Sequence, residues 1–515
     1  MACVGTAGTT HDAYLAARLF DVRAARGVPA ITAAVYTVGH VAAKAVTGRR
    51  KQGVATLATI NDKFHIGSIT KPVTSTLIAE LVERGILSGY GTNLNTTHPW
   101  VFTSPNWGHA QYKTASMLSY MSHVDGMPYQ PSAEPADEYA SLGVTNLILR
   151  RNAYVRDAVR DVPNGPVGTK RVYAGGHIVA ASMLEDITGV RWEDLVKTYV
   201  FNPLGMTSAG FGPMSSTSSV TGPWEHSWNG SAPVPRTWPA NYSYEPHAPA
   251  GRNVHCSITD LLKFGASHLN SSANSLRILT DQSISILRTV HWPNATNLNG
   301  DVSKMTPAWI PGTRTVNNVS IPMFWHNGDN GFNNAWLEVI PTAGTGVSFA
   351  IATNVTSLTS GSPGAEAVND MKKHCIDIVE HFNAIYHINS DLNFGKPASW
   401  SAGSVTYATR INDHNYSTNT QFNGPNAAVK IVFPATTTVR RYHISNPDKK
   451  VTSYAVERWY QPQGGVGGWV TVASGTTINN DGVFTVSATS STQYRLKIKT
   501  ATSWPVAIEE FWLLP

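Results

Sequence analysis

The 515-residue sequence has little cysteine, little charge and no long apolar run. Its cysteines, Cys3, Cys256 and Cys375, allow one disulfide at most, and no two of them have the spacing of metal ligands. No apolar run approaches the ~18–20 residues that span a bilayer. Charged residues are 14% of the chain and form no block of one sign, although the net charge is +6. We therefore expect no metal, no cofactor, no transmembrane segment and no nucleic-acid partner.

The composition favours a globular protein with more than one core. Hydrophobic residues are 42% of the chain and include 15 Trp, 19 Tyr and 15 Phe. A chain of this length is too long for a single compact core, so two or three domains are expected. The low charge and the many Ser, Thr and Asn residues favour a secreted or extracytoplasmic protein. No signal peptide is visible, since the N-terminus lacks a charged segment followed by an apolar core.

Residues 1–390 alternate short apolar strands with helical stretches and form the first predicted domain. Strands are predicted where apolar residues recur at every second position, and helices where they recur about every 3.6 positions. The pattern predicts strands at 31–40, 40–48 and twice within 336–354, and helices at 73–84, 176–189, 257–269 and 365–382. Gly189 is expected to end one helix, and Ser257 or Thr259 to cap another. Strands at both ends around a helical middle indicate the α+β class, a sheet covered by helices.

The pattern changes near residue 392. From there to residue 515, short strand-like runs such as "AAVKIVF" and "YRLKIKT" are separated by turn residues every 8 to 12 positions. Helical periodicity is nearly absent. This pattern is typical of a β-sandwich or a barrel, and it predicts a second domain over residues 391–515.

The stretch "FHIGSITKPVTSTLIAELVERG" (64–85) places Ser68 three residues before Lys71, at the start of a helix. At this spacing both side chains lie on one face, so the amine can reach the hydroxyl. A partly desolvated lysine with a lowered pKa can take the proton of a serine nucleophile. The alternative is that Ser68 or Thr70 only caps a helix whose first turn contains Pro72. An S-x-x-K motif alone does not decide between these readings.

Six segments in one order resemble the penicillin-recognising serine hydrolases, the class C β-lactamase-like family that includes DD-peptidases, D-aminopeptidases and carboxylesterases. The family's motifs match the following stretches of this chain: "GSITKP" (67–72), "MLSYMSHVDGMP" (117–128), "KRVYAGGHIVAASMLEDITG" (170–189), "WEDLVKTYVFNPLGMTSAGFG" (192–212), "PAGRNVHCSITDLLKF" (249–264) and "FWHNGDNGFNNAWLEVIP" (324–341). One departure is Asp125, where the family motif has serine. The resemblance implies an antiparallel sheet flanked by helices, with an all-helical subdomain.

The resemblance also implies roles for matching residues. Ser68 is the expected acylated nucleophile and Lys71 its proton acceptor. Tyr173 matches the motif tyrosine, which shares the work of the base and later protonates the leaving group. We expect cationic neighbours to lower its pKa. The alternative for Tyr173 is a packed core residue before the Gly-Gly turn. Gly175 stands where lactamases keep asparagine, so a contact to the substrate amide is expected to be missing.

The third motif of the family falls on His326 and Gly328. The implied oxyanion hole consists of the backbone N–H groups of Ser68 and Asp329. A satisfied strand-edge histidine is the alternative for His326. Lactamases hold the substrate carboxylate with a lysine where this chain has His326, and Asp329 lies alongside. We therefore expect substrates with a free carboxylate, β-lactams included, to be poor.

The C-terminal segment resembles a discoidin-like (factor 5/8 C-terminal) domain. The resemblance is carried by "WVTVASGTT", "YRLKIKT" and "AIEEFWLLP" within residues 392–515. It implies an eight-stranded jelly-roll sandwich whose loops bind a glycan or a surface. A structural cap on the hydrolase is the alternative, and neither Trp400, Tyr416 nor Trp459 can be assigned to a site.

Together the motifs predict a serine hydrolase that forms an acyl-enzyme at Ser68 and cleaves a peptide or amide bond of a small or peptidic substrate. A carboxylesterase, a weak β-lactamase and a non-catalytic binding protein on the same scaffold are the alternatives.

Overall fold

The computed structural model describes residues 4–5, 12–37, 40–104, 106–129, 131–132, 146–216, 218–237, 245–269, 276–316, 319–341, 346–356, 362–386, 398–402, 405–406, 420–445, 450–462, 467–476, 482–508 and 510–514. The chain divides into two compact units, one mainly of Tyr14–Cys375 and the other mainly of Ile376–Pro515. The predicted boundary after residue 390 lies outside the described residues, and so do Cys3 and Tyr416.

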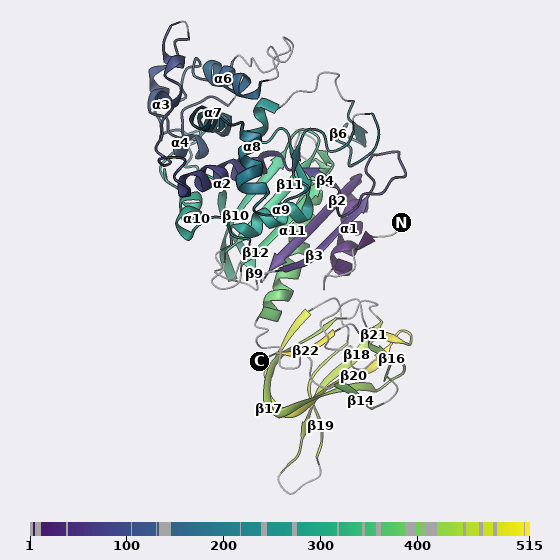
Figure 1. Ribbon diagram of the computed structural model, residues 1–515. Helices are drawn as coiled ribbons and strands as arrows, with labels where there is room; N and C mark the ends of the chain where they lie inside the picture. The colour runs from purple at the N-terminus through teal and green to yellow at the C-terminus, as the bar shows by residue number, and fades with distance from the viewer. Residues whose placement is uncertain are drawn as a thin grey trace. The chain divides into compact units, whose positions relative to one another are not determined.

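A seven-stranded antiparallel sheet forms the centre of the first unit (Figure 1). Its order is β1 (Val4–Gly5), β3 (His40–Gly48), β2 (Ala30–Thr37), β12 (Val347–Thr353), β11 (Asn334–Ile340), β10 (Val319–Asp329) and β9 (Ile310–Val316). The N-terminal hairpin joins the later strands where β2 pairs with β12, with Val35 opposite Phe349. Every residue of β2, β11 and β12 is buried because helices cover both faces. The predicted α+β arrangement of strands from both ends is confirmed.

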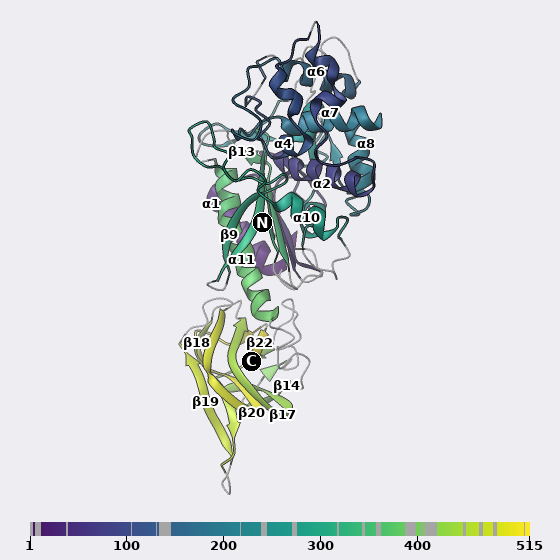
Figure 2. The same ribbon diagram turned by 90° about the vertical axis from the view of Figure 1, so that its left-hand side faces the viewer.

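Helices cover the two faces of this sheet. Successive side chains of a strand point to opposite faces of the sheet. Trp336 and Leu337, neighbours in β11, contact helices on opposite faces. The Nζ of Lys372 in α11 (Pro363–Tyr386) lies 3.0 Å from the ring centre of Trp336. On the other face, a Cβ added to Gly265 of α9 (Ile258–Ser267) would contact Leu337. Helix α1 (Asp12–Arg26) lies beside α11 (Figures 1 and 2), and Arg26 of α1 donates hydrogen bonds to Asp370 and Glu366.

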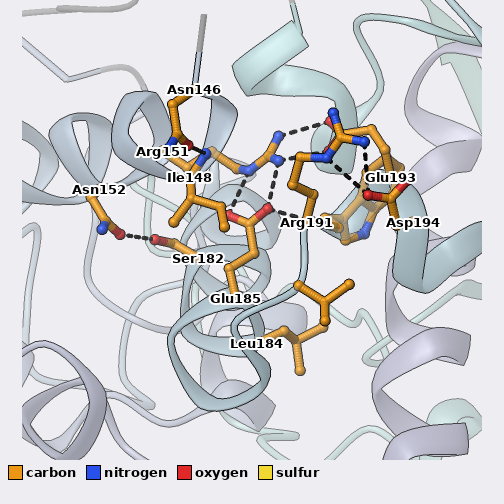
Figure 3. Close-up of polar contacts among 12 residues, drawn as sticks. Asn146, Ile148, Arg151, Asn152, Ser182, Leu184, Glu185, Arg191, Glu193 and Asp194 are labelled. Atoms are coloured by element: carbon orange, nitrogen blue, oxygen red, sulfur yellow. Dashed lines mark hydrogen bonds and ion pairs between the residues drawn. The ribbon is translucent and has the colours of Figure 1, made fainter.

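A group of helices lies beyond one end of the sheet (Figure 1). It contains α3 (Leu94–Thr97), α4 (Met117–Met121), α6 (Leu147–Ala158), α7 (Gly176–Thr188) and α8 (Trp192–Val196). Arg151 of α6 is fully buried and joins three of them (Figure 3). Its guanidinium donates to Glu185 of α7 at 2.6 and 2.8 Å and to Glu193 of α8 at 2.8 and 3.0 Å. These charged hydrogen bonds offset the loss of hydration of the buried cation.

Shorter elements surround the central sheet and the helices. Two further small sheets have the orders β4 (Lys63–His65), β8 (Val254–Ser257), β5 (Gly210–Phe211) and β13 (Val355–Thr356), β6 (His226–Trp228), β7 (Pro233–Pro235). The remaining helices are α2 (Thr70–Glu83), α10 (Asp281–Arg288), the 3-10 helices η1 (Gly67–Ile69), η2 (Pro99–Phe102), η3 (Ala110–Thr114) and η5 (Glu245–Ala250), and the π-helix η4 (Lys197–Phe201). In the described part of the chain, no helix has the length and apolar character needed to cross a membrane.

The second unit is built from antiparallel strands. One sheet has the order β14 (Ala398–Ala402), β17 (Ala427–Ser445), β20 (Gly482–Ala501), β18 (Val451–Tyr460), β19 (Gly468–Gly475), with β22 (Glu510–Leu514) on β17. A second contains β15 (Val405–Thr406), β16 (Thr420–Phe422) and β21 (Val506–Ile508). Both contribute to one apolar core, for example through Leu496 and Phe422. The jelly-roll sandwich and the discoidin-like domain stay predictions.

Candidate active site

Ser68 lies in η1, between strand β4 and helix α2. Neither η1 nor α2 has a side-chain cap: their N-cap residues are Ile66 and Ile69, and the Thr70 hydroxyl donates to the carbonyl of Gly67 at 2.8 Å. The alternative that Ser68 or Thr70 serves only as a helix cap is therefore wrong. The short 3-10 turn leaves the Ser68 hydroxyl at the wall of a pocket.

Lys71 lies one turn further, with its amine against the serine. Its Nζ donates to Ser68 Oγ at 2.9 Å and to the carbonyl of Ala250 at 2.6 Å. Burial, with a smaller contribution from the positive charge of Arg252, lowers the Lys71 pKa to about 7. Near neutral pH a large share of the amine is therefore unprotonated, which is the state that can accept a proton from a hydroxyl.

Tyr173 borders the same pocket and contacts the same amine. The Nζ of Lys71 lies 4.4 Å from the centre of the Tyr173 ring. Burial raises the pKa of Tyr173, and a hydrogen bond with Ser68 opposes this only in part. The expected lowering of this pKa by cationic neighbours is therefore wrong. The phenol is neutral near pH 7 and half-buried at the pocket wall, which excludes the alternative of an enclosed core tyrosine.

The end of β10 lies directly against the serine turn. A Cβ on Gly328 would come within 1.8 Å of the Ile66 carbonyl oxygen. A Cβ on Gly67, whose φ is +52°, would come within 2.4 Å of the backbone nitrogen of Asp329. Only glycine permits so close an approach of two backbones. The approach brings the Asp329 amide beside the turn that carries Ser68.

The His326 ring and the Asp329 carboxylate are both held by hydrogen bonds to the protein itself. The His326 ring is buried, its centre 6.2 Å from that of Tyr173, and its Nδ1–H donates to the Asn327 carbonyl at 2.7 Å. Burial and the Lys71 charge lower its pKa to about 3, so it is neutral. The Asp329 carboxylate accepts hydrogen bonds from Gly331 N at 2.7 Å, Thr356 Oγ1 at 2.8 Å and Asn334 Nδ2 at 3.3 Å. These bonds fix the loop after β10.

The pocket has a volume of about 320 Å³. Besides Ser68, Lys71, Tyr173, Gly175 and Asp329, its lining includes Tyr129, Tyr154, His247, Gly251 and Arg252. At Gly175 a Cβ would come within 1.9 Å of the Tyr154 hydroxyl. Among the described residues, no group of three His, Cys, Asp or Glu side chains is placed to hold a metal ion.

Residues 15–369 match the family model described as Beta-lactamase. The chain belongs to the beta-lactamase family. As a member of this family it is a serine hydrolase. Penicillin-binding protein 4 of Amycolatopsis lactamdurans is 25% identical over 342 residues, which are 65% of this chain and 83% of the relative.

Solved structures of the family share the fold of this chain. The octameric penicillin-binding protein homologue from Pyrococcus abyssi is similar with a TM-score of 0.53 and 17% identity, over 94% of this chain and 99% of that one. The beta-lactamase/D-alanine carboxypeptidase from Yersinia pestis is similar with a TM-score of 0.51 and 17% identity, over 71% of this chain and 99% of that one. At such identities the likeness shows the fold alone.

Arg252 and Tyr154 are two of the lining residues of this beta-lactamase pocket that reasoning from the sequence missed. Arg252 had a visible signal, because the matched stretch beginning at Pro249 reads P-A-G-R where the family motif has P-A-G-G. Tyr154 had none, because its position against Gly175 depends on how α6 packs on α7. Asp125, another departure from the family pattern, is buried and accepts a hydrogen bond from Met127 N at 2.8 Å. It is not among the residues that line the pocket.

Proposed function

We propose that the protein hydrolyses peptide or amide bonds through an acyl-enzyme at Ser68. One observation carries the proposal: the amine of a buried lysine with a pKa of about 7 lies 2.9 Å from a serine hydroxyl at a pocket wall. A serine hydroxyl is a weak nucleophile because its pKa is high. An unprotonated amine at this distance can accept the hydroxyl proton as the oxygen attacks.

In the first step Ser68 Oγ bonds to the substrate carbonyl carbon while its proton passes to Lys71 Nζ. The carbonyl oxygen becomes an oxyanion, which the backbone N–H groups of Ser68 and Asp329 stabilise. The close approach of Gly67 to Asp329 N supports this assignment. His326 is neutral and is not among the residues that line the pocket, so its role is to pack against Tyr173 and orient this end of β10.

In the second step the bond to the leaving nitrogen breaks. The Tyr173 hydroxyl donates a proton to that nitrogen and is reprotonated from the Lys71 ammonium. A water molecule then attacks the acyl carbon and gives a proton to Lys71 Nζ. The bond between the acyl carbon and Ser68 Oγ breaks, the acid leaves, and the Lys71 ammonium returns the proton to Oγ. A protonated phenol beside the amine suits this transfer, since each group passes on a proton that the other restores.

The test is hydrolysis of p-nitrophenyl butyrate, L- and D-alanyl p-nitroanilides and nitrocefin by wild type and Ser68→Ala. We expect turnover of an anilide that the variant loses. Preference for the ester would identify the carboxylesterase alternative, and preference for nitrocefin a weak β-lactamase. Covalent labelling of wild type by a fluorophosphonate distinguishes an enzyme from a binding protein. Equal activity of wild type and Ser68→Ala would contradict the proposal.

For the second unit we propose a discoidin-like β-sandwich over residues 391–515, appended to a hydrolase domain over residues 1–390. The two antiparallel sheets and their separate core support it. A glycan or surface ligand at this unit, and a secreted or extracytoplasmic location, belong to the same proposal. Binding of the isolated unit to a glycan array tests the first, and cell fractionation tests the second.

A further inference from the structure

His123 follows the end of helix α4 in a place that usually belongs to glycine. Two backbone hydrogen bonds close the helix: His123 N donates to the Tyr120 carbonyl at 3.2 Å, and Val124 N donates to the Ser119 carbonyl at 3.0 Å. This pair of bonds is the Schellman motif, which requires a left-handed backbone at the residue after the cap. His123 has a φ of +58°. Its side chain therefore costs folding free energy that glycine would not cost.

The ring and the backbone of His123 both hold the segment that carries Tyr173. The two ring centres lie 4.6 Å apart, and the ring planes are inclined by 30°. The His123 carbonyl accepts a hydrogen bond from Val172 N at 3.0 Å, and its Nδ1 accepts one from Ala174 N at 3.4 Å. A single residue thus contacts Tyr173 and the residues on either side of it.

Tyr173 needs such contacts because no regular secondary structure fixes it. It lies in the irregular segment 171–175, before α7 begins at Gly176. The hydrogen bond from Arg171 N to the Thr296 carbonyl, at 2.8 Å, holds the start of this segment. The bonds to His123 hold its centre. The direction of the phenol therefore depends on packing against His123.

The His123 ring is suited to support a catalytic group without exchanging protons with the substrate. It is buried and is not among the residues that line the pocket. Burial, with a smaller contribution from the charge of Lys71, lowers the pKa of His123 well below its usual value, so the ring is neutral. In a neutral imidazole one nitrogen accepts and the other carries the proton. Acceptance by Nδ1 from Ala174 places that proton on Nε2.

We propose that His123 is a positioning residue, whose ring and Nδ1 orient Tyr173 so that the phenol can donate its proton to the leaving nitrogen. This rests on the proposed function, in which Tyr173 is the proton donor. The alternative is a histidine that only fills the core, since its ring centre also lies 5.2 Å from that of His177. A filling residue affects stability, but it does not distinguish substrates by their leaving groups.

The experiment separates these two roles with matched variants. His123→Gly keeps the left-handed turn and removes the ring and Nδ1. His123→Asn also tolerates the turn, and its amide oxygen can replace Nδ1 as acceptor. The control is His98→Asn, because His98 is a buried histidine after α3 that bonds Asn152 and Ser182 and does not line the pocket. Each variant is assayed with the alanyl p-nitroanilides and with p-nitrophenyl butyrate, and its urea unfolding is measured.

We expect His123→Gly to lower kcat for the anilides about 10- to 100-fold, as for a misplaced catalytic group. The loss for the ester should be smaller, because p-nitrophenolate leaves without a proton. His123→Asn should recover part of the anilide-to-ester ratio, and His98→Asn should keep all of it even where it lowers stability. A ratio that His123→Gly leaves unchanged would overturn the proposal.

A double-mutant cycle tests whether His123 acts through the phenol. In the Tyr173→Phe background, His123→Gly should have little further effect on the anilides, because the two residues act as a unit. Independent losses that multiply in the double variant would contradict the proposal.

Crystal structures of wild type and His123→Gly separate this proposal from the proposed function. We expect the Tyr173 hydroxyl to move by about 1 Å or more relative to Ser68 Oγ, the scale at which misplacement costs activity. Such a displacement supports the role of His123 even if the hydrolysis assays fail. A phenol that keeps its place contradicts that role even if Ser68 proves to be the nucleophile.

Discussion

Three uncharged imidazoles lie near Lys71. The rings of His123, His177 and His326 are buried near it, and its charge is one of the causes that lower the pKa of each. These imidazoles are neutral, so they offer the ammonium no compensating negative charge. The same low-dielectric surroundings penalise the charged form of the lysine. Burial beside neutral rings therefore lowers the Lys71 pKa and leaves the amine able to accept a proton.

The pH dependence of kcat/KM should follow the titration of Lys71. The pKa is lowered to about 7, so the amine is protonated and inactive below that value and free to accept a proton above it. We expect kcat/KM to rise about tenfold per pH unit below pH 7 and to level off above it. Arg252→Gln should move the midpoint upward, because a positive charge near the amine is removed. A profile that stays flat between pH 5 and pH 8 would rule out Lys71 as the base.

Tyr173→Phe should affect amides more than activated esters. An amine leaving group needs a proton from the phenol, whereas p-nitrophenolate leaves without one. We expect a loss of about 10²- to 10⁴-fold in kcat for the anilides, and a smaller loss for p-nitrophenyl butyrate. Steady-state kinetics of both substrates check this. Equal losses would mean that Tyr173 acts on the nucleophile or on packing and does not protonate the leaving group.

At the scale of elements, the contact between η1 and β10 depends on glycine. Gly67→Ala would force Asp329 N and the Gly328 backbone away from the serine turn. We expect kcat/KM to fall about 10²- to 10³-fold, as when one oxyanion-hole donor is lost. The control is Gly53→Ala, where φ is +80° and no atom lies within 4 Å of the added Cβ. That variant should lose only about 1 kcal/mol of stability and keep its activity.

The buried guanidinium of Arg151, which links α6, α7 and α8, should contribute to the free energy of unfolding. Arg151→Met leaves Glu185 and Glu193 buried without their partner, and should lower the free energy of unfolding by about 3–5 kcal/mol. Arg191→Met is the control, since its ion pair with Asp194, also visible in Figure 3, is about half exposed and worth at most about 1 kcal/mol. Urea unfolding compares the two. Similar losses would show that burial of the pair is not decisive.

Local signals predicted elements better than they predicted contacts. Gly189 ends α7 with a φ of +67°, and Ser257 caps α9 by accepting from Asp260 N, which excludes Thr259 as the cap. Both depend on neighbours in the chain. The pairing of β2 with β12 and the Tyr154 hydroxyl against Gly175 depend on tertiary packing, which a single sequence does not encode locally. Motif order located Ser68, Lys71 and Tyr173, whereas the pKa of Tyr173 required knowledge of its burial.

At the scale of the whole molecule, each unit has its own apolar core. Leu262 belongs to the core of the first unit and Leu496 to that of the second, and both side chains are fully buried. We expect two transitions in calorimetry of the intact protein. Leu262→Ala should lower the free energy of unfolding of the first unit, and Leu496→Ala that of the second, each by about 2–5 kcal/mol. Each variant should therefore lower the temperature of one transition. Only Leu262→Ala should reduce hydrolysis at temperatures near the transition that it shifts. A single transition that both variants shift would contradict independent cores.

The contact between Tyr154 and Gly175 makes these two positions interdependent. An asparagine at 175 meets the tyrosine hydroxyl at 1.9 Å already with its first side-chain atom. The Tyr154 hydroxyl must therefore move, or residue 154 must become smaller, before residue 175 can gain a side chain. Libraries that vary positions 154 and 175 together are expected to yield side chains at 175 more often than libraries that vary position 175 alone.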